Sequence, residues 1–265
     1  MVLSYDTVEQ GQPSAWLYVL HGIFGAGRNW ASLARRLVRE RPDWGVRLID
    51  LRQHGTSQGF APPHTIEAAA LDIAELADKL GEAPAGILGH SFGGKVSLMY
   101  AREHAEGLRQ IWIIDSTPAA RPPDGSAWRM LEIVRNCPRE FASRSDLVEL
   151  LQRAGVALPV AQWMATNLEY RDGAYRWRFD LDAIEELLLD FFRTDLWDIV
   201  ETPPAGAELH LVKGRDSNLL DPQATSRIRS IAAENPHVHF HEIAGGHWLN
   251  AENPDGLLAL LTAAI

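Results

Sequence analysis

Short apolar runs alternate with helical patterns along most of this 265-residue chain. This alternation constrains the fold most strongly, because parallel strands joined by crossover helices produce it. Most of the runs are nearly continuous in apolar residues, which is typical of strands covered on both faces. We therefore predict an α/β fold with a mostly parallel sheet and helices on both faces. The expected strands are Trp16–Leu20, Val46–Leu51, Ala85–Leu88, Leu108–Ile114, Ala207–Val212 and His237–Ile243, with Val2–Gln10 as a weaker candidate for an outer strand.

Helical patterns lie between these runs. The last helix is announced by Asn253-Pro254, a capping residue followed by proline at the first helical position. Leucines at 257, 258, 260 and 261 give this helix its apolar side. The other helices expected in the core are Trp30–Arg39, Ile66–Leu80 and Gly94–His104.

The alternation stops after Asp115. Between Thr117 and Pro204 there is no strand-like apolar run, but helical patterns cover Trp128–Arg135, Asp146–Arg153 and Leu181–Phe192. Prolines stand at both ends of this stretch, as is common where a chain leaves and re-enters a domain. We expect one α/β core formed by residues 1–116 and 205–265, with a helical cap inserted at 117–204. Its large aromatic residues could line a pocket, although most are expected to form the insertion's own small core: Trp128, Trp163, Trp177, Phe191, Phe192 and Trp197.

The sequence Gly89-His90-Ser91-Phe92-Gly93 lies between a predicted strand and a predicted helix. A strand that reverses into a helix within a few residues strains its central residue, and the flanking glycines allow close approach of neighbouring chain. The serine oxygen is then presented at a helix N-terminus, which favours negative charge. We predict that Ser91 is a nucleophile.

A serine nucleophile needs a base, and ten histidines compete for this role. His247 follows the last predicted strand in Gly245-Gly246-His247-Trp248, at the same edge of the sheet as Ser91, and is the predicted base. His21, His54 and His90 are expected to shape turns and loops. A metal site on the alternating His237, His239 and His241 is disfavoured because no fourth ligand is evident.

Two aspartates compete to orient the histidine. Asp115 follows one predicted strand directly, and Asp216 comes shortly after the next one, so the order Ser, Asp, His fits both. Attack on a carbonyl also requires donors for the oxyanion. The backbone N–H of Phe92 is one predicted donor. The second is assigned to Ile23, in the sharp turn His21-Gly22-Ile23-Phe24-Gly25.

Several function classes are disfavoured by composition. The formal net charge is −10 and no Lys/Arg-rich run occurs, which argues against nucleic acid or an anionic membrane surface as a partner. Neither a signal peptide nor a membrane-spanning segment is expected, and a cytoplasmic protein is predicted. The lone Cys137 can form no internal disulfide. The glycines near position 25 lack nucleotide-binding spacing, so neither a nucleotide cofactor nor a metal is expected.

Over its whole length the chain resembles the α/β-hydrolase superfamily. More narrowly, it is similar to the small serine esterases and thioesterases that include YbfF-type and ABHD11-like enzymes. In that family the acid follows the earlier strand, which implies Asp115. The position that carries the acid in many other superfamily members is Ser217 here. The motifs that carry the resemblance are His21–Gly25 with Asn29-Trp30, Asp50–Ser57, Gly89–Lys95, Ile114–Pro118, Asp172-Gly173 with Trp177–Phe179, and Gly245–Trp248. The chain departs from the family at Arg121–Gly125.

These observations predict hydrolysis of a small carboxylic ester or acyl thioester through a Ser91 acyl-enzyme, with His247 as base and Asp115 as orienting acid. One rival uses the same triad for another reaction, such as elimination on a menaquinone precursor or cofactor-free perhydrolysis. The other rival is a noncatalytic protein that holds a small apolar ligand under the cap.

Overall fold

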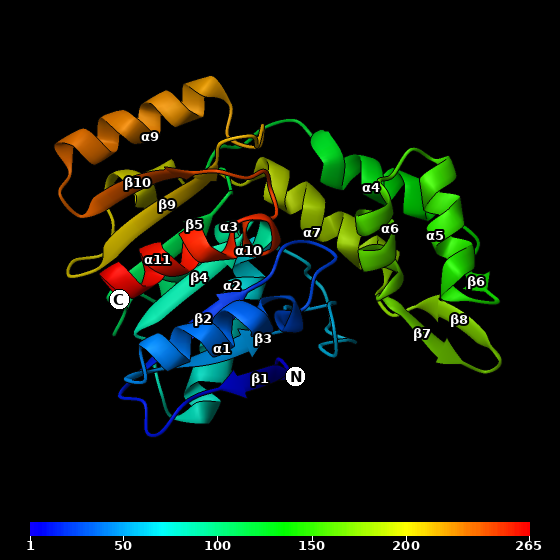
Figure 1. The fold of residues 1–265 in the computed structure, drawn as a ribbon, viewed down its shortest axis with the longest axis horizontal. Helices are drawn as coiled ribbons and strands as arrows, with labels where there is room; N and C mark the ends of the chain where they lie inside the picture. The colour runs from blue at the N-terminus through cyan, green and yellow to red at the C-terminus, as the bar shows by residue number, and fades with distance from the viewer.

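The computed structural model describes residues 1–265, and a seven-stranded sheet forms its centre (Figure 1). The strand order is β1-β3-β2-β4-β5-β9-β10; β1 pairs antiparallel with β3, and all other pairs are parallel. The predicted α/β fold is thus confirmed, including the outer strand at the N-terminus. The strands are β1 (Tyr5–Val8), β2 (Ala15–Leu20), β3 (Trp44–Ile49), β4 (Gly86–His90), β5 (Gln110–Ile114), β9 (Glu208–Gly214) and β10 (Val238–Ile243).

Helices cover both faces of the sheet, as the continuous apolar strands required. On one face α1 (Ala31–Glu40) packs against α11 (Pro254–Ala264), and their leucines share a core with Val19, Val46 and Trp112 of the sheet. The opposite face carries α2 (Ile66–Leu80), α3 (Phe92–Glu103) and α9 (Pro222–Glu234). Two one-turn elements, the 3₁₀ helix η1 (Gly27–Trp30) and α10 (Leu249–Glu252), follow β2 and β10. None of the helices combines the length and apolar character that crossing a bilayer requires.

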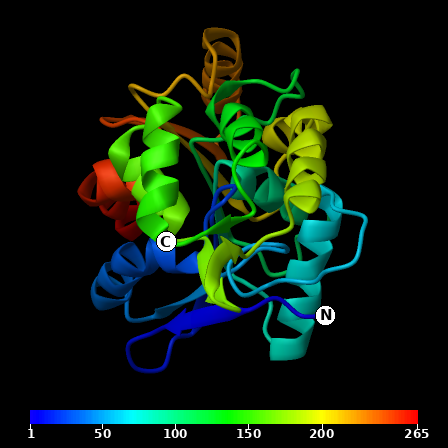
Figure 2. The same ribbon diagram turned by 90° about the vertical axis from the view of Figure 1, so that its right-hand side faces the viewer.

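The chain between β5 and β9 forms a layer beyond one end of the sheet (Figures 1 and 2). Its helices are α4 (Gly125–Arg135), α5 (Arg144–Arg153), α6 (Leu158–Ala165) and α7 (Leu181–Arg193), whereas α8 (Trp197–Glu201) packs against α3 and α9 of the core. The helical character agrees with the prediction for this stretch.

The layer is not purely helical, although its sequence contains no strand-like apolar run. A small antiparallel sheet forms in the order β6 (Glu140–Phe141), β8 (Ala174–Trp177) and β7 (Leu168–Arg171). Its strands are short and half polar, so they give no apolar run. The available signal is Asp172-Gly173, whose φ angles of 51° and 86° form the tight turn of the β7–β8 hairpin.

A buried lysine connects this layer to the core. Lys95 of α3 is completely buried, and its Nζ donates to the carbonyl oxygens of Ala119 (2.9 Å), Phe191 (2.5 Å) and Thr194 (2.7 Å). Ala119 lies where the chain leaves the core, and the other two carbonyls lie at the end of α7. All three ammonium protons are therefore used to hold both ends of the layer against the helix that follows Ser91.

Candidate active site

Ser91 occupies a strained turn between β4 and α3. Its φ of 52° and ψ of −115° lie outside the favourable regions for an L-residue. The turn is possible because the residues two positions before and after Ser91 are glycines: a Cβ on Gly89 would lie 2.0 Å from the Gly93 carbonyl oxygen, and a Cβ on Gly93 would lie 2.6 Å from the His21 carbonyl oxygen. The structure therefore places Ser91 at the N-terminus of a helix, as predicted.

Asp115 and His247 meet at the same edge of the sheet. Asp115 is completely buried after β5, and its Oδ2 accepts a hydrogen bond from Nδ1 of His247 at 2.7 Å. The same carboxylate accepts from the Ser217 hydroxyl at 2.5 Å and from the Gly214 backbone N–H at 3.0 Å. Asp216 is exposed and its side chain makes no hydrogen bond, so the structure brings His247 together with Asp115 alone.

The hydrogen bond from Ser217 was not foreseen. By its resemblance to the α/β-hydrolase superfamily, the chain has Ser217 at the position where many other members carry the acid. The structure shows why a serine fits this position: its hydroxyl donates to Asp115, the carboxylate that contacts His247. Sequence spacing marks the position but cannot show that its side chain binds the other acid.

Two free backbone donors adjoin Ser91. The N–H groups of Ile23 and Phe92 donate to no protein acceptor. The turn that carries Ile23 approaches the nucleophile closely, because a Cβ on Gly22 would lie 3.3 Å from Cβ of Ser91. Both residues line one cavity with Ser91 and His247. The structure thus brings the predicted oxyanion donors to the same place as the serine and histidine.

The neighbouring histidines are held by backbone groups. His90 Nε2 lies 2.8 Å from the His247 carbonyl oxygen, and His21 Nε2 accepts from the Leu51 N–H at 3.0 Å. Burial, followed by repulsion from His247, lowers the pKa of His90 to about 3. Burial likewise lowers the pKa of His21 and brings that of His54 to about 3. These rings are neutral at pH 7 and support the loops that carry the site.

The histidines at positions 237, 239 and 241, just before and within β10, make pairwise contacts. His237 and His239 both lie within hydrogen-bond distance of the Glu208 carboxylate, and His241 lies 3.1 Å from His210. No group of three or more histidine, cysteine, aspartate or glutamate side chains converges on a common point that a metal could occupy.

The cavity at Ser91 is small, about 30 Å³. Its apolar wall comes from α7 and from the loop after β9, and Arg121 and Asp124 lie at its polar side. Leu188 and Leu219 had no motif that marked them beforehand. Of the aromatic residues considered from the sequence, Phe191 and Phe192 line this cavity, whereas Trp177 stacks on Phe179 away from it.

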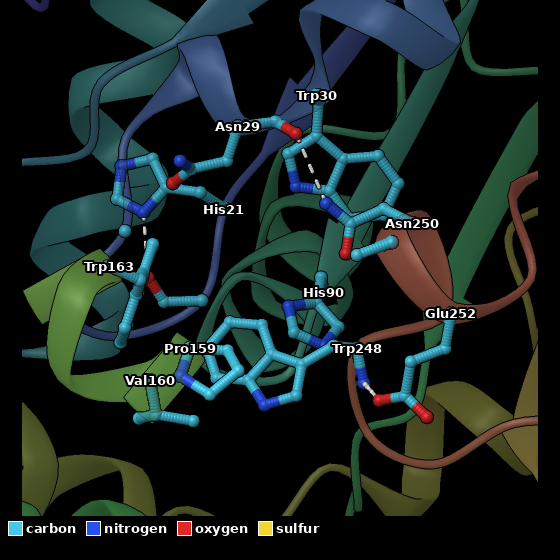
Figure 3. A pocket seen from close by; sticks show the side chains of 13 residues that line it. His21, Asn29, Trp30, His90, Pro159, Val160, Trp163, Trp248, Asn250 and Glu252 are labelled. Atoms are coloured by element: carbon cyan, nitrogen blue, oxygen red, sulfur yellow. Dashed lines mark hydrogen bonds between the residues drawn. The ribbon is translucent and has the colours of Figure 1, made fainter. Parts of the chain in front are cut away.

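A second cavity, of about 460 Å³, is lined in part by His21 and His90 (Figure 3). Trp30, Trp163 and Trp248 form much of its wall, together with Pro159 and Val160 of α6. The Trp163 and Trp248 rings meet edge to face with centroids 4.7 Å apart, which joins α6 to the segment after His247. The two cavities share no lining residue.

Comparison with known proteins gives concordant results. Residues 15–254 match the family model described as alpha/beta hydrolase fold. The chain is 27% identical to the sn-1-specific diacylglycerol lipase ABHD11 of Mus musculus, covering 98% of this chain and 84% of that protein. It is also 27% identical to esterase YbfF of Escherichia coli, covering 96% and 94%. A solved marine microorganism esterase superimposes with a TM-score of 0.85 at 24% identity, covering 100% and 99%. The chain therefore belongs to the α/β-hydrolase family and, within it, resembles ABHD11 and the YbfF esterase.

Proposed function

We propose that this protein is a serine hydrolase that cleaves a small carboxylic ester or acyl thioester through an acyl-enzyme on Ser91. The observation that carries the proposal is the 2.7 Å hydrogen bond from His247 to a fully buried Asp115, beside a serine in a strained turn. Relatives named as a lipase and an esterase support the choice of ester hydrolysis.

Asp115 fixes the protonation pattern of the histidine. Because Nδ1 of His247 donates its hydrogen to Asp115, Nε2 carries the free lone pair and can accept the proton of the Ser91 hydroxyl. Ser91 and His247 line the same cavity but are not hydrogen-bonded to each other in this structure. In the proposed mechanism, substrate binding completes this hydrogen bond, as is common when a site without substrate is loosely aligned.

Acylation then follows from the positions of the donors. The Ser91 oxygen attacks the carbonyl carbon while Nε2 of His247 takes the hydroxyl proton. Negative charge develops on the carbonyl oxygen, next to the free N–H groups of Ile23 and Phe92. The histidine returns its proton to the leaving oxygen or sulfur, and water repeats the sequence to release the acid.

The cavity at Ser91 favours a short acyl group. A volume of about 30 Å³ holds about two water-sized groups. Phe191, Phe192 and Leu188 make that space apolar. We therefore expect acetyl and propionyl esters to be better substrates than long-chain esters.

The division into a core of residues 1–116 and 205–265 and a cap of residues 117–204 is part of the same proposal. It is supported by the position of the inserted layer, which supplies Arg121, Phe191 and Phe192 to the cavity at Ser91. In this arrangement the core provides the chemistry and the cap provides the acyl-binding wall.

The test combines acyl-enzyme trapping with turnover. Wild-type protein and Ser91→Ala are incubated with a fluorophosphonate and with a panel of short-chain esters and acyl thioesters. We expect a covalent adduct on Ser91, and hydrolysis that Ser91→Ala reduces by about 10⁴-fold or more. A Ser91 adduct without hydrolysis of the panel would favour elimination or perhydrolysis on the same triad. No adduct and no turnover would favour a ligand-binding protein.

A further inference from the structure

We infer that the tryptophan-walled cavity binds the alcohol or thiol part of the substrate, whereas the small cavity at Ser91 binds the acyl part. This inference rests on the proposed acyl-enzyme mechanism and adds the leaving-group specificity to it. It assigns a role to the larger cavity, which none of the three triad residues lines.

The direction of proton transfer places the leaving group. When the acyl-enzyme forms, the Ser91 oxygen bonds to the carbonyl carbon and the bond to the leaving oxygen or sulfur breaks. That atom receives its proton from Nε2 of His247, so it must lie beside the histidine. The acyl group must extend in another direction, into the space lined by Phe191 and Phe192.

The larger cavity lies against the catalytic loops at three points. Gly22, His90 and Trp248 line it, and these residues directly precede Ile23 and Ser91 or directly follow His247 in the chain. His90 contacts His247 with ring centroids 4.6 Å apart. The cavity therefore borders the segments that carry Ile23, Ser91 and His247, although it shares no lining residue with the cavity at Ser91.

The two cavities differ in volume. The tryptophan-walled cavity has a volume of about 460 Å³, whereas the cavity at Ser91 has a volume of about 30 Å³. The larger value lies within the range of ordinary small-molecule sites, and the smaller one admits only a short acyl chain. The substrate that fits both is a short-chain ester of a bulky alcohol or thiol.

The wall of the larger cavity favours an uncharged group. Three indole rings with Pro159 and Val160 form its apolar part, and the polar part includes His21, Asn29, His90 and Asn250 (Figure 3). The one carboxylate, Glu252, already accepts hydrogen bonds from the backbone N–H groups of Gly246 (2.6 Å) and Trp248 (3.1 Å). No lysine or arginine lines the cavity, so a phosphate would find no partner there.

Two hydrogen-bond donors at this cavity have no acceptor in the protein, so the leaving group should also carry an acceptor. Asn29 accepts at its Oδ1 from the Ala26 N–H and at its backbone oxygen from Asn250, but its Nδ2 donates to no protein acceptor. The indole N–H of Trp30 also has no protein acceptor. An ether, carbonyl or hydroxyl oxygen on the leaving group would satisfy such donors. Aryl or arylalkyl alcohols with an oxygen substituent match this combination.

The first experiment fills the cavity from α6. Val160→Trp adds an indole to the wall, and Val160→Ala is the matched control that empties it further. We measure kcat/KM for methyl acetate and for 4-methoxybenzyl acetate, which share one acyl group. Val160→Trp is expected to lower the ratio of kcat/KM for the benzyl ester to kcat/KM for methyl acetate by about tenfold or more, since the added indole displaces the benzyl ring.

The second measurement separates the two steps of the reaction. Deacylation occurs after the leaving group has gone, so the decay rate of acetyl-Ser91 in single-turnover experiments is expected to be unchanged in Val160→Trp. In the reverse of acylation, 4-methoxybenzyl alcohol gives its proton to His247 and its oxygen attacks the acyl carbon, releasing Ser91. Wild-type protein is thus expected to form 4-methoxybenzyl acetate from p-nitrophenyl acetate and this alcohol, and Val160→Trp to form about tenfold less relative to acetate.

Phe191→Ala provides the opposite pattern, with altered preference among acyl chains and unaltered preference between the two acetates. Equal losses for methyl and benzyl esters in Val160→Trp, or an unchanged ratio between them, would overturn the assignment of the cavity. Failure of the proposed function itself is a different result, because wild-type protein would then show no acetyl group on Ser91. Thermal unfolding of each variant checks that the fold is retained.

Discussion

Replacement of Asp115 by asparagine tests the proposed mechanism at its most constrained point. The Asp115 carboxylate accepts from Gly214 N–H through Oδ1, and from His247 and Ser217 through Oδ2. An asparagine side chain that keeps its oxygen toward Gly214 must place its NH₂ group toward His247. Nδ1 of the histidine must then accept a hydrogen bond, and the ring proton moves to Nε2.

The size of the effect follows from this change of tautomer. A histidine protonated at Nε2 cannot take the Ser91 proton, and the buried negative charge that stabilises the imidazolium is also lost. We expect kcat/KM to fall by about 10⁴-fold, which corresponds to about 5 kcal/mol of transition-state stabilisation. Stability is expected to change much less, because Asn and Asp have the same shape and the Ser217 hydroxyl can rotate to accept.

The assay is hydrolysis of p-nitrophenyl acetate by Asp115→Asn, Ser217→Ala and Asp216→Asn under one set of conditions. Ser217→Ala removes one of three hydrogen bonds to Asp115 and is expected to lower kcat/KM by less than about tenfold. Asp216→Asn alters an exposed side chain and is expected to have no measurable effect. Wild-type activity in Asp115→Asn, or a large loss in Asp216→Asn, would refute the assignment of the acid.

Three further changes test other parts of the structure. Lys95→Met removes the donor shared by the carbonyl oxygens of Ala119, Phe191 and Thr194. The free energy of unfolding, measured by urea titration, is expected to fall by about 2 kcal/mol. An unchanged urea midpoint would contradict the anchoring role of Lys95. Phe191→Ala enlarges the cavity at Ser91 and is expected to raise the ratio of kcat/KM for p-nitrophenyl hexanoate to that for the acetate by about tenfold, measured against wild type. Burial lowers the pKa of His210 to about 3, so its stabilising effect is complete above pH 6.5 and is lost as pH falls toward 3. His210→Phe keeps an aromatic ring stacked on Trp112 but removes the titrating group. Between pH 7.5 and 5 the free energy of unfolding of this variant is expected to fall by about 1–2 kcal/mol less than that of the wild type. An identical pH dependence in the two proteins would show that His210 does not titrate on unfolding.

The sheet could be predicted from the sequence because its strands are buried on both faces. Strands such as Gly86–His90 and Gln110–Ile114 consist almost entirely of fully buried residues, so the apolar runs mark them directly. The same reasoning placed Ser91 and His247, since residues that directly follow parallel strands gather at one edge of the sheet.

The rest of the structure depends on contacts between distant segments. The β7–β8 hairpin alternates polar and aromatic residues over only four positions in each strand, which is too short for a clear period. The larger cavity is lined by residues of η1, α6 and α10. Every pair of these elements is separated by more than eighty residues in the sequence, so no local pattern predicts that they meet. The choice between Asp115 and Asp216 is similar, because it depends on which carboxylate reaches His247.

Backbone hydrogen bonds of the sheet hold Ser91 and Asp115 independently of the inserted layer. The Ser91 N–H donates to the Ile114 oxygen at 3.0 Å, and the Asp115 N–H donates to the Val212 oxygen at 2.7 Å. Each residue thus extends the ladder between neighbouring parallel strands by one bond, even though both have positive φ. The side chains proposed to select the substrate, Phe191 and Trp163, lie instead on α7 and α6 of the layer. Substitutions on those helices can therefore change the preferred ester while the geometry at Ser91 and Asp115 stays the same, and the paired substrate measurements on Val160→Trp and Phe191→Ala depend on this separation.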